Sequence, residues 1–158
     1  MKKKDIIEYV VIILVIVLIR TFVVTPIRVN GSSMVDTLED GNLMILKKYE
    51  KSSIERFDIV VLKVGKEKLI KRVIGMPKED IEYRKGVLYI NDEKLENSYG
   101  YGNTLDFKDY CGENEYFVMG DNRENSVDSR KLGCISKNDI LGTTDFVFFP
   151  FKKFGKVE

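Results

Sequence analysis

The chain has 158 residues, enough for one modest domain with a short extra segment, and its 26 Lys and Arg residues nearly balance its 25 Asp and Glu residues. This balance gives no indication of nucleic acid as a partner. The absence of histidine excludes a Ser-His-Asp triad, a Cys-His dyad and histidine zinc sites, and two cysteines are too few for an all-cysteine zinc site. A hydrolytic serine in this chain would therefore need a base other than histidine.

The N-terminal segment has the pattern of a membrane anchor. Residues 1–5 form a basic head, and residues 6–24 are apolar except for Glu8 and Arg20 near the ends of the segment. A bilayer core needs about 20 apolar residues of helix. A cleaved signal peptide would show an Ala-x-Ala site and a core helix would show a polar stripe, and the segment has neither. The pattern predicts a transmembrane signal-anchor helix over residues 6–24, with the head in the cytoplasm and residues 26–158 on the outer face.

After Pro26 the pattern changes to short runs rich in Val, Ile, Leu and Tyr, separated by Gly-, Asn-, Asp- or Lys-rich breaks. We predict hairpin turns at residues 84–86 and 91–92 and a surface loop at residues 98–109. No long 3.6-residue period occurs after residue 26. The fold class is therefore mainly β, a small barrel or folded sheet over residues 26–158. The predicted strands are residues 42–47, 58–64, 68–74, 81–84, 87–90, 116–119 and 140–149.

Two stretches supply a candidate nucleophile and a candidate base. Gly31-Ser32-Ser33-Met34 places two hydroxyls just after the anchor, although such a stretch is often only a turn. Lys71 lies in a strand-like run whose one face should be buried, while its neighbour Arg72 should point to solvent. A buried lysine can act as a base if its pKa falls from about 10.4 to roughly 7 or 8, which costs about 4 kcal/mol. The alternative is an exposed lysine in an edge strand.

The third stretch, Gly120–Arg130, is dense in Asp, Asn, Ser and Arg and follows a predicted strand. Such residues compete for backbone partners and do not readily form a helix or a strand. The stretch is either a solvated loop or a polar network in which Asp128 pairs with Arg130. Cys111 and Cys134 flank this stretch, so they could form a disulfide, or they could be buried free thiols.

Four blocks of the sequence, in this order, resemble the type I signal peptidases, a family of membrane-anchored serine endopeptidases. They are Gly-Ser-Ser-Met-x-x-Thr-Leu at residues 31–38, Arg-Phe-Asp-Ile-Val-Val at residues 56–61, Lys-Arg-Val-Ile-Gly-Met-Pro at residues 71–77, and the stretch of residues 120–130. The short outer domain is similar to the Gram-positive kind. The resemblance implies cleavage of the signal peptides of exported precursors after an Ala-x-Ala site.

The resemblance also assigns roles to individual residues. Ser33 would be the nucleophile and Lys71 its general base, with no metal or cofactor. Ser126 would position Lys71 by a hydrogen bond, and Asp128 and Arg130 would hold the site together. The oxyanion would be stabilised by the backbone N–H of Ser33, with a contribution at Gly31. The pockets for small substrate side chains would be lined by Val29, Met34, Leu38, Leu69 and Ile70.

The sequence departs from the family pattern at two turns, because Asp36 replaces a usual proline and Lys78 replaces a usual glycine. Neither change removes a residue with an implied chemical role. The expected partners are signal peptides, membrane lipid and, by proximity, the secretion translocon, but not nucleic acid. The alternative is a catalytically silent relative that acts in surface-protein or pilus assembly, although relatives of that class have lost residues that this chain retains.

Overall fold

The computed structural model describes residues 3–96 and 99–157, and it is mainly β with antiparallel sheets, as the sequence predicts. The helices are α1 (Lys3–Phe22) and the short α2 (Ser129–Leu132), with 3-10 turns at Tyr49–Ser52, Lys137–Asp139 and Phe151–Lys153. The strands are β1 (Val24–Arg28), β2 (Leu43–Lys47), β3 (Ile59–Val64), β4 (Glu67–Gly75), β5 (Asp80–Arg84), β6 (Val87–Ile90), β7 (Glu93–Lys94), β8 (Phe107–Tyr110), β9 (Glu115–Met119), β10 (Ile135–Ser136), β11 (Ile140–Thr143), β12 (Phe146–Phe149) and β13 (Gly155–Lys156).

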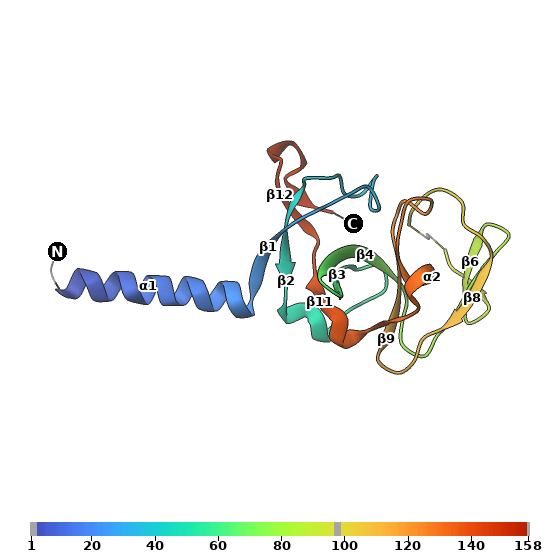
Figure 1. Ribbon diagram of the computed structural model, residues 1–158, viewed down its shortest axis with the longest axis horizontal. Coiled ribbons are helices and arrows are strands. Elements are labelled where there is room, and N and C mark those ends of the chain that lie inside the picture. The colour runs from blue at the N-terminus through green and yellow to red at the C-terminus, as the bar shows by residue number, and fades with distance from the viewer. Residues whose placement is uncertain (1–2, 97–98, 158) are drawn as a thin grey trace.

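Helix α1 extends away from the β strands as a separate rod (Figure 1). It has Asp5 in its first turn and Arg20 in its last, and residues 1 and 2 of the predicted basic head lie outside the described residues. Within residues 3–96 and 99–157, no helix combines the length and the apolar character needed to cross a membrane. The transmembrane helix that we expected over residues 6–24 is therefore not confirmed, and the end of that segment forms the start of β1 instead.

The large sheet has the order β10-β9-β4-β3-β11-β2-β12-β13, with β1 paired to β2. Strand β4 pairs with β3 along residues 67–72, and with β9 only from Arg72 onward. Strand β1 pairs with β2 over residues 24–28. Within the part of the chain that the structure describes, one edge of β1 and one edge of the first half of β4 thus remain without a strand partner.

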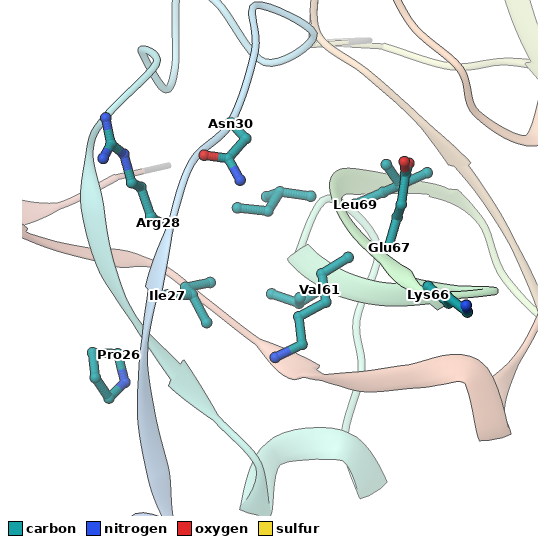
Figure 2. A pocket seen from close by; sticks show the side chains of 10 residues that line it. Pro26, Ile27, Arg28, Asn30, Val61, Lys66, Glu67 and Leu69 are labelled. Atoms are coloured by element: carbon teal, nitrogen blue, oxygen red, sulfur yellow. The ribbon is translucent and has the colours of Figure 1, made fainter.

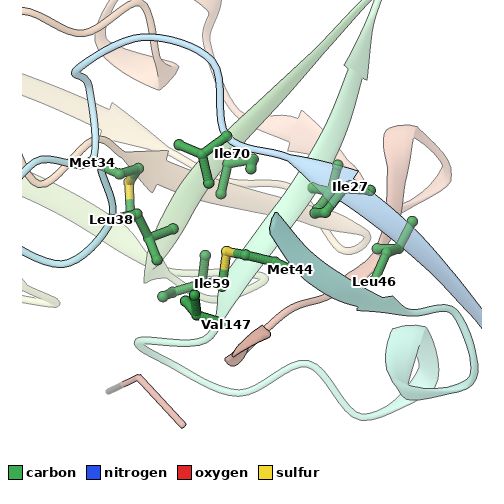
Figure 3. Close-up of a cluster of buried hydrophobic side chains, with 10 residues drawn as sticks. Ile27, Met34, Leu38, Met44, Leu46, Ile59, Ile70 and Val147 are labelled. Carbon is green, nitrogen blue, oxygen red and sulfur yellow. The ribbon is translucent and has the colours of Figure 1, made fainter. Parts of the chain in front are cut away.

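The core beside the candidate site is built from apolar residues that alternate along the strands. In β2, for example, Met44 and Leu46 are buried while their neighbours are half-buried, which is the period of a strand with one face inward. Figure 3 shows Met44 and Leu46 with Ile27, Ile59, Ile70 and Val147 in one cluster, and Met34 and Leu38 join it from the turn that follows β1. Burial of these two side chains holds the turn, and therefore Ser33, against the sheet.

A second, smaller sheet has the order β7-β6-β5-β8. The predicted hairpin turns connect β5 to β6 and β6 to β7. Its apolar face packs on β4 and β9 through a cluster that includes Ile74, Ile81, Leu88 and Phe117. Cys111, at the end of β8, forms a disulfide with Cys134, which directly precedes β10. The small sheet is thus tied covalently to the segment that follows residues 120–130.

Apart from the two-residue strands β7, β10 and β13, which the sequence pattern did not predict, three segments differ from the sequence prediction. Residues 107–110 form β8, although we expected a loop over 98–109, of which residue 98 lies outside the described residues. Residues 140–149 form two strands instead of one, because β11 pairs chiefly with β3 whereas β12 pairs with β2. Residues 24–28 form β1. In each case the partner strand is distant in sequence, so local pattern does not reveal the pairing.

Candidate active site

The structure brings Ser33 and Lys71 into direct contact. Lys71 Nζ donates a hydrogen bond to Ser33 Oγ at 2.7 Å and a second one to Ile70 O at 2.8 Å. The neighbouring hydroxyl, Ser32 Oγ, instead accepts a hydrogen bond from Asn125 Nδ2 at 2.7 Å. Of the two adjacent serines, Ser33 is therefore the one placed beside a base.

Lys71 is only 2% exposed, because it lies within β4 on the face that the Ser33 turn and residues 124–127 cover. Burial lowers the pKa of the Lys71 ammonium from its ordinary value of 10.5 to about 8. The carboxylates of Asp128 and Asp121 oppose this shift, while the nearby Arg130 adds to it. A neutral amine is therefore accessible at mildly alkaline pH, as a general base requires.

The turn that carries Ser33 is held by its own backbone. Leu38 N–H donates to Met34 O at 2.7 Å, and Asp36 has a φ of 82° within this turn. Gly31 N–H is engaged by Asp40 Oδ1 at 2.8 Å, so it is not free for the oxyanion contribution that the resemblance implied. Within the described residues, the N–H of Ser33 has no acceptor, which leaves it available to an incoming oxygen.

Residues 120–130 wrap around the Ser32-Ser33 segment. Asn122 N–H donates to Ser33 O at 3.0 Å, and Asn122 Nδ2 donates to Ser32 O at 3.3 Å. The loop approaches so closely that a Cβ at Gly120 would lie 2.4 Å from Ser126 Oγ and 2.5 Å from Ser33 O. Glycine is therefore required at position 120 by space, since its φ is not in the left-handed region.

Asp128 anchors this loop and is fully buried. Its carboxylate accepts hydrogen bonds from Gly120 N–H at 3.0 Å and from Arg130 Nε and Nη2 at 2.8 and 2.7 Å. It also caps α2 by accepting from Arg130 N–H. Burial alone would raise the pKa of Asp128, but the hydrogen bonds from Arg130 and Gly120 outweigh it and keep that pKa below its ordinary value.

A second buried pair lies behind the Ser33 turn. Arg72 donates to Asp121 Oδ1 and Oδ2 at 3.0 and 2.8 Å, and Thr37 Oγ1 donates to Asp121 Oδ2 at 2.6 Å. Arg72 is 1% exposed, so the expectation that it points to solvent is wrong. The face of β4 that we assigned to water is covered by Thr37 and Asp121, which bond the guanidinium, and by the ring of Tyr99, whose centroid lies 4.1 Å from Arg72 Cζ. The sequence reasoning did not single out Thr37 or Asp121.

Ser126 departs from its expected contact. It lines a hollow of about 320 Å³ together with Ser33 and Lys71, and it is 8% exposed. Its Oγ has no hydrogen-bond partner among the described residues, although it lies near enough to Asp128 to help keep the pKa of that carboxyl low. The expected hydrogen bond between Ser126 and Lys71 is not formed, and the two acceptors of Nζ are Ser33 Oγ and Ile70 O.

A groove of about 650 Å³ adjoins this hollow, with which it shares Asn30 and Leu69. Figure 2 shows that its lining comes from the β1 segment on one side and from β3 and β4 on the other. Of the five expected pocket residues, Leu69 and Ile70 line this groove. The other three, Val29, Met34 and Leu38, are buried in the adjacent core and line neither hollow.

The comparisons with known proteins agree with the four sequence blocks. Residues 3–149 match the family model described as signal peptidase, peptidase S26. Signal peptidase I S of Bacillus subtilis is 38% identical, over 98% of this chain and 95% of the relative, and signal peptidase I of Bacillus caldolyticus is 39% identical, over 91% and 90%. The chain belongs to the signal peptidase family.

The fold agrees with this membership. A crystal structure of a signal peptidase I from Enterococcus faecalis matches with a TM-score of 0.53 and 32% identity, covering 58% of this chain and 96% of the solved chain. Membership in a peptidase family makes the chain a hydrolase. The sequence pattern did not identify Asn122 and Asn125, whose side chains bond Ser32. Both lie within the block of residues 120–130, but an asparagine in a polar loop does not by itself indicate which segment it contacts.

Proposed function

We propose that this chain removes signal peptides from exported precursors with Ser33 as nucleophile and Lys71 as general base. The observation that carries the proposal is the 2.7 Å hydrogen bond to Ser33 Oγ from Nζ of Lys71, a lysine that is almost fully buried. Neutral Lys71 accepts the Ser33 proton as Oγ attacks the scissile carbonyl. Lys71 then returns that proton to the leaving amine, and water hydrolyses the acyl-enzyme. A catalytically silent relative is not favoured, because both residues are present and in contact.

The oxyanion that forms during this attack needs a donor. The unengaged N–H of Ser33 is suited to that role, because it belongs to the attacking residue and has no acceptor among the described residues. Asn122 helps to fix its orientation, because Asn122 Nδ2 donates to Ser32 O, the carbonyl of the same peptide group. Asp128 and Arg130 hold the loop that carries Asn122, which supports their proposed structural role.

The groove supports an extended peptide as substrate. The free edges of β1 and of the first half of β4 flank it, so a signal peptide can add as a strand and bond its backbone to both. Leu69 and Ile70 present apolar surface next to Lys71. Small apolar side chains before the cut, as in Ala-x-Ala, are consistent with this lining.

Membrane attachment and an outer location are part of the proposal. Most apolar side chains of α1 are exposed, among them Ile7, Ile13 and Ile16 at 58–62%, and lipid would cover them. The Cys111–Cys134 disulfide supports an oxidising compartment for the β domain, residues 26–158. Protease treatment of intact protoplasts should degrade this domain and spare residues 1–5. Release of the full chain by carbonate at pH 11 would contradict stable insertion of α1.

The dyad is tested by cleavage of a detergent-solubilised precursor with an Ala-x-Ala site. Ser33→Ala should abolish cleavage, because no other hydroxyl contacts Lys71 among the described residues. Ser32→Ala removes only the Asn125 hydrogen bond and should retain a large part of the activity. Far-ultraviolet circular dichroism checks that both variants are folded. Equal loss of activity in the two variants would contradict the choice of Ser33.

A further inference from the structure

A second large hollow, of about 710 Å³, opens next to the candidate dyad. It shares Glu124, Ser126 and Lys131 with the hollow that contains Ser33 and Lys71. It shares no lining residue with the signal-peptide groove, which meets the dyad hollow at Asn30 and Leu69. The dyad hollow therefore lies between two larger ones, and an extended chain that passes Ser33 would enter from one and leave through the other.

The direction of such a chain follows from the proposed function, on which this inference rests. The groove takes the residues before the scissile bond, because the free edges of β1 and β4 beside it can bind the backbone of an extended signal peptide. The residues after the scissile bond must then leave on the side of Ser126. They are the first residues of the mature protein, and their amino group departs when the acyl-enzyme forms.

One cation that lines this hollow is available to bind an anionic side chain. Lys131 is exposed on α2, and its ammonium has no partner among the described residues. The other lining cations are engaged, since Arg130 binds Asp128 and Arg123 donates to Gly120 O. Two lining carboxylates keep their negative charge while each accepts a backbone amide: Glu124 accepts from Asn103 N–H at 3.2 Å and Asp106 accepts from Lys85 N–H at 3.0 Å. Lys131 therefore adds an exposed positive charge to a lining of mixed charge.

The same hollow also has an apolar contact point. Leu105 lines it and is 86% exposed, more than any other large hydrophobic side chain in the described residues. Phe107, the first residue of β8, lies beside it and is half-buried. A peptide that lies in the hollow would cover Leu105. Removing this apolar surface from water would favour binding.

We propose that this hollow binds the first residues of the mature chain, and that Lys131 there prefers an acidic side chain while Leu105 contacts the residues that follow. Lys131 and Leu105 are thus specificity determinants on the leaving side of the cut. An exposed ion pair has a small free energy, so we expect about a two- to fivefold preference, and salt should weaken it.

The test uses precursor peptides that are identical up to the cut and have Asp, Asn or Lys as the second mature residue. With the unaltered protein, kcat/KM should be about two- to fivefold higher for Asp than for Asn, and lower for Lys. Lys131→Glu should reverse this order. The matched control Lys137→Glu, the same charge change outside the hollow, should keep it. An Asp-to-Lys ratio that is equal in the unaltered protein and in Lys131→Glu overturns the proposal.

Leu105 is tested by the length of the peptide after the cut. Leu105→Ala should lower kcat/KM for a peptide with six mature residues by several-fold more than for one with a single mature residue. Leu132→Ala, the same change on α2 outside the hollow, should leave the ratio between the two peptides unchanged. A ratio unaffected by Leu105→Ala contradicts this contact.

Failure of this inference is distinguishable from failure of the proposed function. If the peptide with Asn as its second mature residue is not cut at the Ala-x-Ala site, the proposed function is wrong. The mature-side site, which is the hollow lined by Leu105 and Lys131, is then wrong as well. If that peptide is cut but the rates do not depend on the mature residues, only the mature-side site is contradicted.

Discussion

At the residue scale, the protonation of Lys71 links the fold to the reaction. Its pKa of about 8 leaves about one molecule in ten with a neutral amine at pH 7. We expect kcat/KM to rise with pH and to level off above an apparent pKa near 8. Lys71→Arg should be inactive across the range, because a guanidinium does not deprotonate. Initial rates from pH 6 to 10 measure both effects, and a rate independent of pH in this range would exclude Lys71 as the base.

The same pKa predicts how Lys71 affects stability. Folding lowers its pKa, so holding the charged form costs the folded state free energy below pH 8, and that cost disappears as pH rises to 10.5. Lys71→Met should therefore be inactive yet more stable than the parent at pH 7, by on the order of 3 kcal/mol. The difference should shrink between pH 8 and 10.5. Urea unfolding at several pH values tests this, and a constant difference would be the contrary result.

At the element scale, two turns accommodate residues where the family usually has others. Asp36 has a φ of 82°, which proline cannot adopt, so this turn has a backbone different from one built around proline. Lys78 has a φ of 65° at the position of the usual glycine, so the turn between β4 and β5 keeps a left-handed residue without the usual glycine. The turn at Lys78 therefore keeps the left-handed backbone that the usual glycine would have, whereas the turn at Asp36 cannot have the backbone of a turn with proline.

The turn at Lys78 yields a stability prediction. Lys78→Gly should stabilise the protein by roughly 0.5–1 kcal/mol, because glycine adopts φ > 0 without a Cβ clash. The lost ion pair with Glu113 is exposed on both sides and should matter little. Lys85→Gly, at another position with positive φ, provides a matched comparison, and thermal unfolding gives both values. A marked loss of stability in Lys78→Gly would contradict this account of the turn.

At the scale of the whole molecule, the disulfide joins the small sheet to the loop that holds the candidate site. Cys111 and Cys134 are separated by 23 residues, which include β9 and the stretch 120–130. Closing a loop of this length stabilises a fold by about 3 kcal/mol, through the reduced entropy of the unfolded chain.

Replacing both cysteines by alanine should therefore lower the free energy of unfolding by about 3 kcal/mol. Dithiothreitol should destabilise the parent by a similar amount and leave the double variant unchanged. Urea unfolding with and without reductant measures all four states. An equal response of the parent and the double variant to the reductant would mean that the disulfide does not stabilise the fold.

The sequence by itself determined the class of chemistry and the order of the parts. The absence of histidine required another base, Lys71 stood in an apolar run, and four blocks in a fixed order indicated the family. The mainly β class and most strands of the large sheet also followed from local patterns of side chains, since alternation is a property of neighbouring residues.

Only the tertiary structure decided which groups meet. It showed which of the two adjacent serines lies beside the base. Ser33 contacts Lys71, 38 residues further along the chain, whereas Ser32 contacts Asn125, 93 residues further along. It buried Arg72, left Ser126 Oγ without a hydrogen bond among the described residues, and formed β1 and β8. These outcomes depend on pairing and packing between segments far apart in the chain, and the local order of residues carries no information about such distances.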